Sequence, residues 1–185
     1  MRAKGTGFLH DTWESRQKDE WLTPPDLVRD LGVFDLDPCA PLQRPWDTAR
    51  HHFTIQDNGM ERPWFGRVWM NPPYGRETGL WLEKLRKHGN GIALIFARTE
   101  TKMFFQHIWS GADAVLFLKG RLAFFHVNGS KGGHAGAPSC LVAYGRSNVT
   151  ALKRSHLNGV LITRWQQAGK TRKAINSSGL IAAVV

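Results

Sequence analysis

Cysteine is scarce in this sequence and long apolar runs are missing, which excludes several classes of protein. The 185 residues contain two cysteines, Cys39 and Cys140, far apart in the chain. Such a pair is neither a disulfide framework nor a zinc-ligand spacing. No apolar stretch reaches the roughly 18 residues of a membrane-spanning helix, and the segment from Met1 to His10 lacks the apolar core of a signal peptide. We therefore expect a cytoplasmic protein with no metal site and no membrane contact.

Acidic residues are missing from the last part of the chain. Up to Asp113 there are fifteen Lys or Arg and fifteen Asp or Glu, whereas ten Lys or Arg and no acid follow, so the net charge of +10 arises entirely beyond Asp113. A one-sided positive charge is typical of a nucleic-acid-binding protein. A solvated basic tail would have the same composition. The charge therefore indicates a polyanionic partner without identifying it.

Alternating strand and helix patterns predict one α/β domain. Residues 1–18 are polar and aperiodic, which predicts a flexible arm; residues 19–165 form the domain; and the basic segment 166–185 is expected to be a disordered tail. Thr23 is the expected N-cap of a short helix that starts at Pro24 and ends before Gly32.

The remaining elements follow from the periodicity of apolar residues. We expect strands at 33–37, 66–70, 91–96, 114–118 and 159–163, and helices at 80–88, 102–109 and 149–156. Segments 122–127 and 139–144 are expected to pair as a hairpin around a mobile glycine-rich loop at 128–136, and 41–63 reads as irregular. The apolar runs at 91–96 and 114–118 indicate strands covered on both faces, and hence a mostly parallel central sheet. Ligands bind such sheets at the carboxyl ends of the strands.

The tetrapeptide Asn71-Pro72-Pro73-Tyr74 directly follows one of these strands. Two prolines form a rigid turn that has no backbone N–H, so their carbonyls are left free to accept hydrogen bonds. The Asn71 side-chain oxygen adds another acceptor, and the Tyr74 ring can stack on a planar base. The lone pair of an exocyclic amine is delocalised into its base, and acceptors that take both amine hydrogens leave this lone pair free to attack. The pattern therefore predicts chemistry on an amine or amide nitrogen.

This motif resembles the catalytic motif of amino-methyltransferases that use S-adenosylmethionine. The chain is similar, more specifically, to the phage-type DNA N6-adenine methyltransferases of the Dam family. The likeness runs from about Glu20 to Tyr144. It rests on the motif and on four further segments: Glu20 to Pro25, Phe34 to Ala40, Gly120 to Phe124, and Ala137 to Cys140.

The resemblance implies a Rossmann-like methyltransferase fold and an adenine-specific DNA methyltransferase that acts on a flipped-out base, with Asn71 to Tyr74 as the catalytic residues. S-adenosylmethionine would be the cofactor. The residues implied to bind it are Thr23, Pro24, Pro25, Asp37, Pro38, Cys39, Ala40 and Asp57, where Asp37 faces its ammonium group and Asp57 its adenine amine. An Asp-Asn-Gly turn at Asp57 also needs no function. The glycine pair usual in the first loop of this fold is missing, and no acid for the ribose is identifiable; the stretch 41–55 offers only Asp47.

The partner implied is DNA, expected to be double-stranded and recognised over a short sequence. Candidate DNA contacts are Arg121, Lys131, His134 and Arg146, with Phe124 either stacking on the target base or belonging to the core. The basic segment 170–173 either adds non-specific attraction or is solvated tail. His51 and His52 lack a third metal ligand and are expected to be a surface pair without a catalytic role.

Two rival hypotheses remain open. The motif is also compatible with methyl transfer to cytosine N4, to guanine in RNA or to glutamine in a protein. A non-catalytic DNA-binding relative is the other rival, although such a protein would be expected to have lost Asn71 or Tyr74, and both are present. A phage or prophage origin, with protection of DNA from restriction, is the biological role that the family implies.

Overall fold

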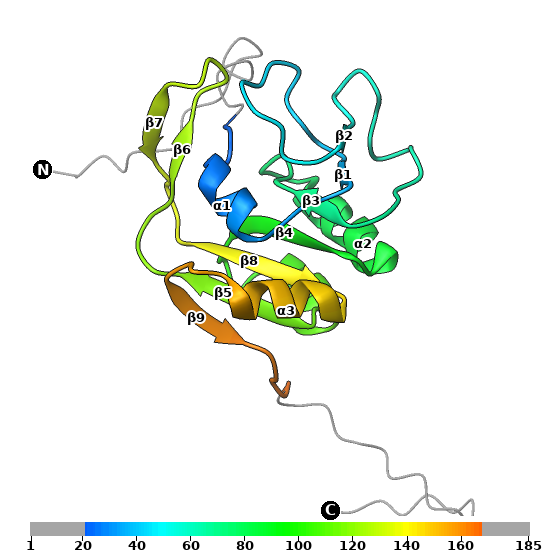
Figure 1. Cartoon of the computed structure of the whole chain (residues 1–185). Coiled ribbons are helices and arrows are strands. Elements are labelled where there is room, and N and C mark those ends of the chain that lie inside the picture. Colours follow the sequence, from blue (N-terminus) through cyan, green and yellow to red (C-terminus); the bar gives the residue numbers. More distant parts are fainter. Residues whose placement is uncertain (1–20, 168–185) are drawn as a thin grey trace, which may run out of the picture.

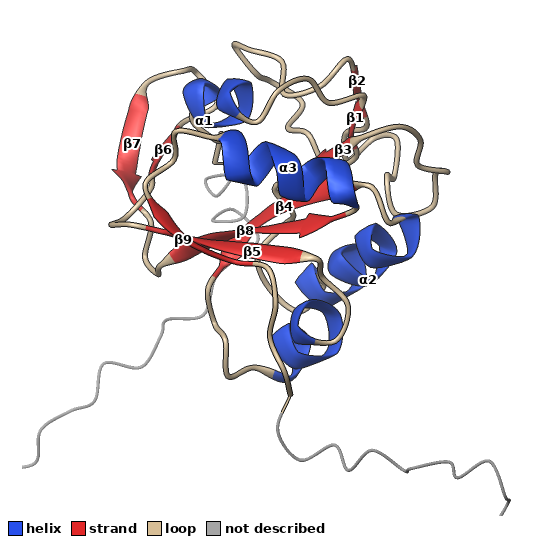
Figure 2. Ribbon diagram, turned by 60° about the horizontal axis from the view of Figure 1, so that its bottom comes forward, coloured by secondary structure: helices blue, strands red, loops and turns tan. Residues whose placement is uncertain are grey.

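The computed structural model describes residues 21–167, in which helices cover both faces of a seven-stranded sheet (Figures 1 and 2). Helices α1 and α3 lie on one face, and α2 and the π-helix η2 lie on the other (Figure 2). The helices are α1 (Pro25–Asp30), α2 (Thr78–His88), η2 (Phe104–Trp109) and α3 (Arg146–Arg154). The predicted arm at 1–18 and most of the predicted tail lie outside the described residues.

The sheet has the strand order β2-β1-β3-β4-β8-β5-β9 and is mixed. Its strands are β1 (Leu36–Asp37), β2 (His51–His52), β3 (Val68–Met70), β4 (Gly91–Phe96), β5 (Ala114–Leu118), β8 (Ser139–Tyr144) and β9 (Gly159–Ile162). Strands β2, β1, β3 and β4 run parallel to one another, whereas β8 runs antiparallel to both β4 and β5, and β9 runs antiparallel to β5. The expectation of a mostly parallel sheet therefore holds for one half of it.

Strands β1, β3, β4 and β5 point the same way, and we call the end where they stop the carboxyl end of the sheet. Strand β8 begins at this end. The antiparallel pair β6 (Ala123–Phe125) and β7 (Lys131–His134) connects β5 to β8 and therefore also lies here (Figure 1).

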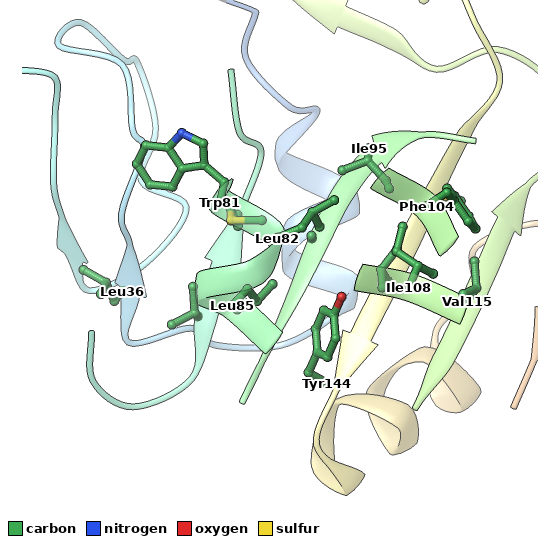
Figure 3. Packing of buried hydrophobic residues seen from close by; sticks show 14 residues of the cluster. Leu36, Trp81, Leu82, Leu85, Ile95, Phe104, Ile108, Val115 and Tyr144 are labelled. Atoms are coloured by element: carbon green, nitrogen blue, oxygen red, sulfur yellow. The ribbon is translucent and has the colours of Figure 1, made fainter. Parts of the chain in front are cut away.

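The core divides into two layers because successive strand residues face opposite sides of a sheet. In β4, Ala93 and Ile95 pack towards α2 and η2, whereas Ile92 and Leu94 pack towards α1 and α3. Figure 3 shows the first of these layers, in which Leu82 and Leu85 of α2 meet Ile108 of η2 and residues of the sheet. All six residues of β8 are buried, so this strand forms the middle of the core.

Most elements match the sequence analysis, and β4 and β5 have the predicted bounds. The first helix does not begin as predicted, because Pro24 is its N-cap and Pro25 its first residue, with no side-chain cap bond. Pro24 has a ψ of 127°, the extended conformation expected of a residue that precedes proline. Strand β2 lies within the stretch 41–63, which was expected to be irregular.

The predicted hairpin is wrong. The segment 139–144 joins the main sheet between β4 and β5, while β6 pairs with β7, which belongs to the predicted mobile loop. A fully apolar strand is buried best between two other buried strands, which explains the position of β8. Gly132 allows β7 to pack closely against Trp21, because a Cβ at this position would lie 2.5 Å from the Trp21 ring.

Candidate active site

The motif Asn71-Pro72-Pro73-Tyr74 lies at the carboxyl end of the sheet, directly after β3. Asn71 donates from Nδ2 to the backbone oxygen of Trp21, at 3.2 Å. Because the amide nitrogen is committed to Trp21, the side-chain oxygen is turned towards the hydroxyl of Tyr74, which donates to it at 3.2 Å. The segment before α1 thus fixes the orientation of the Asn71 acceptor.

Within the described part of the chain, the Pro73 carbonyl has a donor and the Pro72 carbonyl has none. The Pro73 carbonyl accepts a hydrogen bond from Thr78 Oγ1 at 2.8 Å, and the same hydroxyl accepts from the backbone N–H of Gly75 at 2.9 Å. Thr78 is the buried first residue of α2, so helix and motif are tied together. Among residues 21–167, no protein donor bonds to the Pro72 carbonyl. The Pro72 carbonyl is therefore free, Asn71 Oδ1 is shared with the Tyr74 hydroxyl, and the sequence-based expectation that both prolyl carbonyls are free is wrong for Pro73.

Tyr74 has an accessible ring and an inward-pointing hydroxyl. The residue is 38% exposed, and its ring stacks on Phe96 at the end of β4, with the centroids 4.2 Å apart and the planes 16° from parallel. The hydroxyl lies near both Asn71 Oδ1 and the carbonyl of Leu94, the latter at 3.4 Å. Burial of this hydroxyl raises the pKa of Tyr74. In this conformation Tyr74 occupies the Asn71 acceptor.

Asp37 ends β1 and is a buried carboxylate beside the motif. It is 3% exposed, accepts from the backbone N–H of Cys39 at 3.1 Å, and accepts from Thr48 Oγ1 at 2.5 Å. Burial raises the pKa of Asp37 to about 6, although these hydrogen bonds oppose the shift. The group is therefore mostly charged at neutral pH, with few partners for that charge.

Cys39 links β1 to the motif. Its thiol donates to the Asn71 carbonyl at 3.4 Å, so the ends of β1 and β3 are adjacent. Burial, and then the charge of Asp37, raise the pKa of the Cys39 thiol well above its usual value. A protonated thiol is a poor nucleophile, so Cys39 connects the two strand ends rather than reacting.

Asp57 lies in a turn at the same end of the sheet. Gly59 packs against the carbonyl of Pro38 so closely that a Cβ on this glycine would lie 1.9 Å from that oxygen. One carboxylate oxygen of Asp57 accepts from both N–H and Oγ1 of Thr54, at 2.8 Å each, which lowers the pKa of Asp57. The structure thus brings Asp57 close to the Asp37 segment, but one of its oxygens stabilises the local turn.

Thr23 and Pro24 lie between α1 and the β6–β7 hairpin. Leu22 exchanges backbone hydrogen bonds of 2.8 and 3.0 Å with Phe125, and Thr23 next to it is 3% exposed. On the α1 side, Pro24 lines a groove together with Phe125, Lys119 and Arg121; the other lining residues are apolar apart from Asn158, and none is acidic. This groove extends the basic surface of the hairpin.

Three of the four predicted DNA contacts gather at the carboxyl end of the sheet. Lys131 and His134 are exposed on β7, and Arg121 is exposed and donates to the Ala135 carbonyl at 3.4 Å. Arg146 does not join them. It begins α3 just after β8, whose last residue pairs with the first residue of β4, so it lies at the opposite end of the sheet (Figure 1).

Phe124 lies in the core, one of the two positions left open by the sequence. It is 4% exposed and packs in the layer beneath α1 and α3. The next residue, Phe125, is half-buried and meets the ring of Trp46 edge-on, with the centroids 5.3 Å apart. The alternation of side chains along β6 predicts this difference between neighbouring phenylalanines, whereas nothing in the sequence indicates that Trp46 contacts the hairpin.

Two kinds of feature are absent from the described residues. Among residues 21–167, no three His, Cys, Asp or Glu side chains lie close enough together to hold a metal ion. No helix in the described part of the chain is both long and apolar enough to cross a membrane.

An α/β sheet with this motif at its carboxyl end is compatible with a methyltransferase fold. The model of the family DNA N-6-adenine-methyltransferase (Dam) matches residues 11–152, and the chain belongs to this family. No curated protein and no solved structure matches it.

Proposed function

We propose that this protein methylates the exocyclic N6 of a flipped-out adenine in DNA, with S-adenosylmethionine as methyl donor. The observation that carries the proposal is the pair of acceptors at the end of β3, Asn71 Oδ1 and the Pro72 carbonyl, next to the buried carboxylate of Asp37. The family membership of the chain supports DNA adenine as the substrate.

The two acceptors account for activation of the amine. Each takes one of the two hydrogens of the adenine N6 group, which draws the nitrogen out of conjugation and frees its lone pair. The base must first leave the duplex because its amine is otherwise paired. The transferred group makes the nitrogen cationic, and its proton passes to the acceptors or to water. Asn71 and Pro72 therefore act by position and by fixed dipoles, and no separate general base is needed.

We expect Tyr74 to move when the base enters. Its hydroxyl now donates to Asn71 Oδ1, the acceptor that the adenine amine would use. Removal of this hydroxyl from Asn71 as the base enters would leave the ring free to stack on the base instead of on Phe96.

The residues at the end of β1 fit a cofactor that carries an ammonium group. A buried carboxylate without a cation is costly, as the raised pKa of Asp37 reflects, and a cationic partner offsets that cost. We infer that Asp37 to Ala40 bind the aminoacyl part, that Thr23 to Pro25 cover it, and that Asp57 faces the adenine part. When bound, S-adenosylmethionine supplies a methyl group activated on a sulfonium. The sheet would then be a Rossmann-like methyltransferase sheet.

Double-stranded DNA would lie across the β6–β7 hairpin. Arg121 and Lys131, with Lys119 in the adjoining groove, supply positive groups at the end of the sheet that carries the motif, and the exposed ring of His134 lies among them. Contacts of this kind bind phosphates and give affinity rather than sequence choice. A short recognition sequence and a role in protecting phage DNA from restriction are further parts of this proposal.

The direct test is transfer of labelled methyl from S-adenosylmethionine to unmethylated DNA, followed by nucleoside analysis. We expect N6-methyladenine from the wild type and a rate lower by about 10²–10³-fold for Asn71→Ala, the usual effect of removing one catalytic dipole. Gln106→Ala, which removes an exposed amide on η2, is the matched control and should behave as wild type.

Other products would overturn parts of the proposal. N4-methylcytosine would keep the fold and the acceptor pair but change the base. Label found only in RNA or protein would change the substrate class. Failure to bind S-adenosylmethionine in a calorimetric titration would favour the non-catalytic DNA-binding rival.

A further inference from the structure

The side chain of His52 is largely covered, contrary to the sequence-based expectation of a surface histidine pair. Its side chain is 7% exposed, whereas its neighbour His51 is exposed. Its Nε2 atom lies 3.3 Å from the backbone nitrogens of both Thr48 and Ala49, and both N–H groups donate to it. The ring of His52 therefore holds the last part of the loop that leaves β1 and returns at β2.

These hydrogen bonds define the state of the imidazole. A nitrogen that accepts two N–H groups carries no proton, so the ring is neutral with its proton on Nδ1. The charged and titratable groups facing the ring are Arg44, Asp47 and His51; Asp47 Oδ1 lies 3.7 Å from Nε2. Burial is the main cause that lowers the pKa of His52, and Arg44 adds to it while Asp47 opposes it. A neutral ring is thus consistent with its surroundings.

The loop that His52 holds carries the partner of Asp37. Thr48, whose N–H is bonded to His52, donates from Oγ1 to Asp37 Oδ2 at 2.5 Å. The other carboxylate oxygen accepts from the N–H of Cys39. Four backbone hydrogen bonds join the β1 and β2 segments, and they fix the backbone on either side of Asp37. They start at Arg50, so Thr48 and Ala49 lie outside this ladder and their N–H groups are held by His52 instead. The orientation of the carboxylate itself depends on the bonds from Thr48 and Cys39.

We propose that His52 is a positioning residue for cofactor binding, which orients the Asp37 carboxylate through Thr48. This inference rests on the proposed function, because it takes Asp37 as the group that receives the ammonium of S-adenosylmethionine. His52 itself does not touch the cofactor in this proposal; it fixes the backbone from which the Thr48 hydroxyl reaches Asp37.

Calorimetric titration of the full chain with S-adenosylmethionine tests the proposal. His52→Phe keeps a ring of similar size but removes the acceptor, and we expect it to raise the Kd about tenfold, the effect of one lost anchoring hydrogen bond. Thr48→Val should raise the Kd similarly. His52→Gln should restore most of the affinity, because its amide oxygen can accept from the same N–H groups. His51→Gln is the matched control and should bind as wild type.

A double-mutant cycle separates positioning from general destabilisation. If His52 acts through Asp37, His52→Phe costs little further affinity in the Asp37→Asn background. Equal losses in both backgrounds, or wild-type affinity for His52→Phe, would overturn the role of His52 while leaving the proposed function intact. Absence of binding by the wild type itself would overturn both.

Discussion

The two halves of the sheet differ in the length of their strands and in the residues that follow them. Strands β2, β1 and β3 have two or three residues each and end in the polar groups of the site, whereas β8, β5 and β9 have four to six residues and carry none of the motif. Short strands leave their ends to loops, so the Asp37 carboxylate is held by hydrogen bonds from Thr48 and Cys39, and the Asn71 amide is held by the bond that it donates to the Trp21 carbonyl. Both halves contribute buried residues to the core, but the polar groups of the site lie only at the ends of the short strands.

The largest expected effect is on stability and tests the half of the sheet formed by β8, β5 and β9. Leu141 in β8 is fully buried and pairs with Leu94 on one side and Leu116 on the other. Leu141→Ala should lower the free energy of unfolding by about 2–5 kcal/mol, as is usual for a buried leucine that leaves a cavity. Urea denaturation measures this loss. The KM values for cofactor and DNA should stay near wild type at a temperature where the variant is folded; a changed KM would mean that the two halves are not separable.

The next largest effect tests the half of the sheet formed by β2, β1 and β3. Here a substitution should raise the stability of the folded protein instead of lowering it. The pKa of Asp37 is raised from 3.8 to about 6 in the folded protein, so its ionisation opposes folding progressively as the pH rises from about 4 through 6. Asp37→Asn removes that charge. It should raise the stability at pH 7.5 by about 1–3 kcal/mol, given about 1.4 kcal/mol for each pKa unit, and the gain should shrink as the pH falls towards 4.

Asp37→Asn should also weaken S-adenosylmethionine binding by about tenfold or more, since a neutral amide no longer pairs with an ammonium group. Thermal unfolding at pH 7.5 and 4.5, together with calorimetric titration, measures both effects. A variant less stable than wild type at pH 7.5 would show that the carboxylate supports the fold, and would remove the contrast between the two halves.

Individual strands also differ in how well the sequence predicts their bounds. The apolar runs of β4 and β5 predict their bounds, because a strand buried on both faces has an unbroken hydrophobic pattern. Strand β2 consists of two histidines and has no such pattern, so neither the strand nor the burial of His52 could be predicted.

Within the site, the position of the motif after a strand could be predicted, whereas its contacts with distant parts of the chain could not. Asn71 to Tyr74 follow a strand as expected, because proline ends a strand at a defined position. The bond between Asn71 and Trp21 joins residues far apart in the chain, and the hydroxyl of Tyr74 reaches Asn71 only through the packing of its ring on Phe96. The same reason explains the wrong partner given to β8, since its neighbours depend on the whole sheet.

The smallest expected effect compares the two ends of the sheet through a matched pair of arginines. Arg121 and Arg146 are both exposed, but Arg121 lies at the carboxyl end beside the hairpin and Arg146 at the opposite end. If DNA lies at the carboxyl end, Arg121→Ala should weaken DNA binding several-fold at low salt and reduce the slope of log Kd against log salt by about one, the effect of one phosphate contact. Arg146→Ala removes the same charge and should leave both quantities near wild type.

Fluorescence anisotropy over a salt series measures this difference. Equal losses in the two variants would mean that DNA responds to the overall charge of the domain, and a larger loss for Arg146→Ala would place the DNA on α3, away from the end of the sheet at which Asn71 lies.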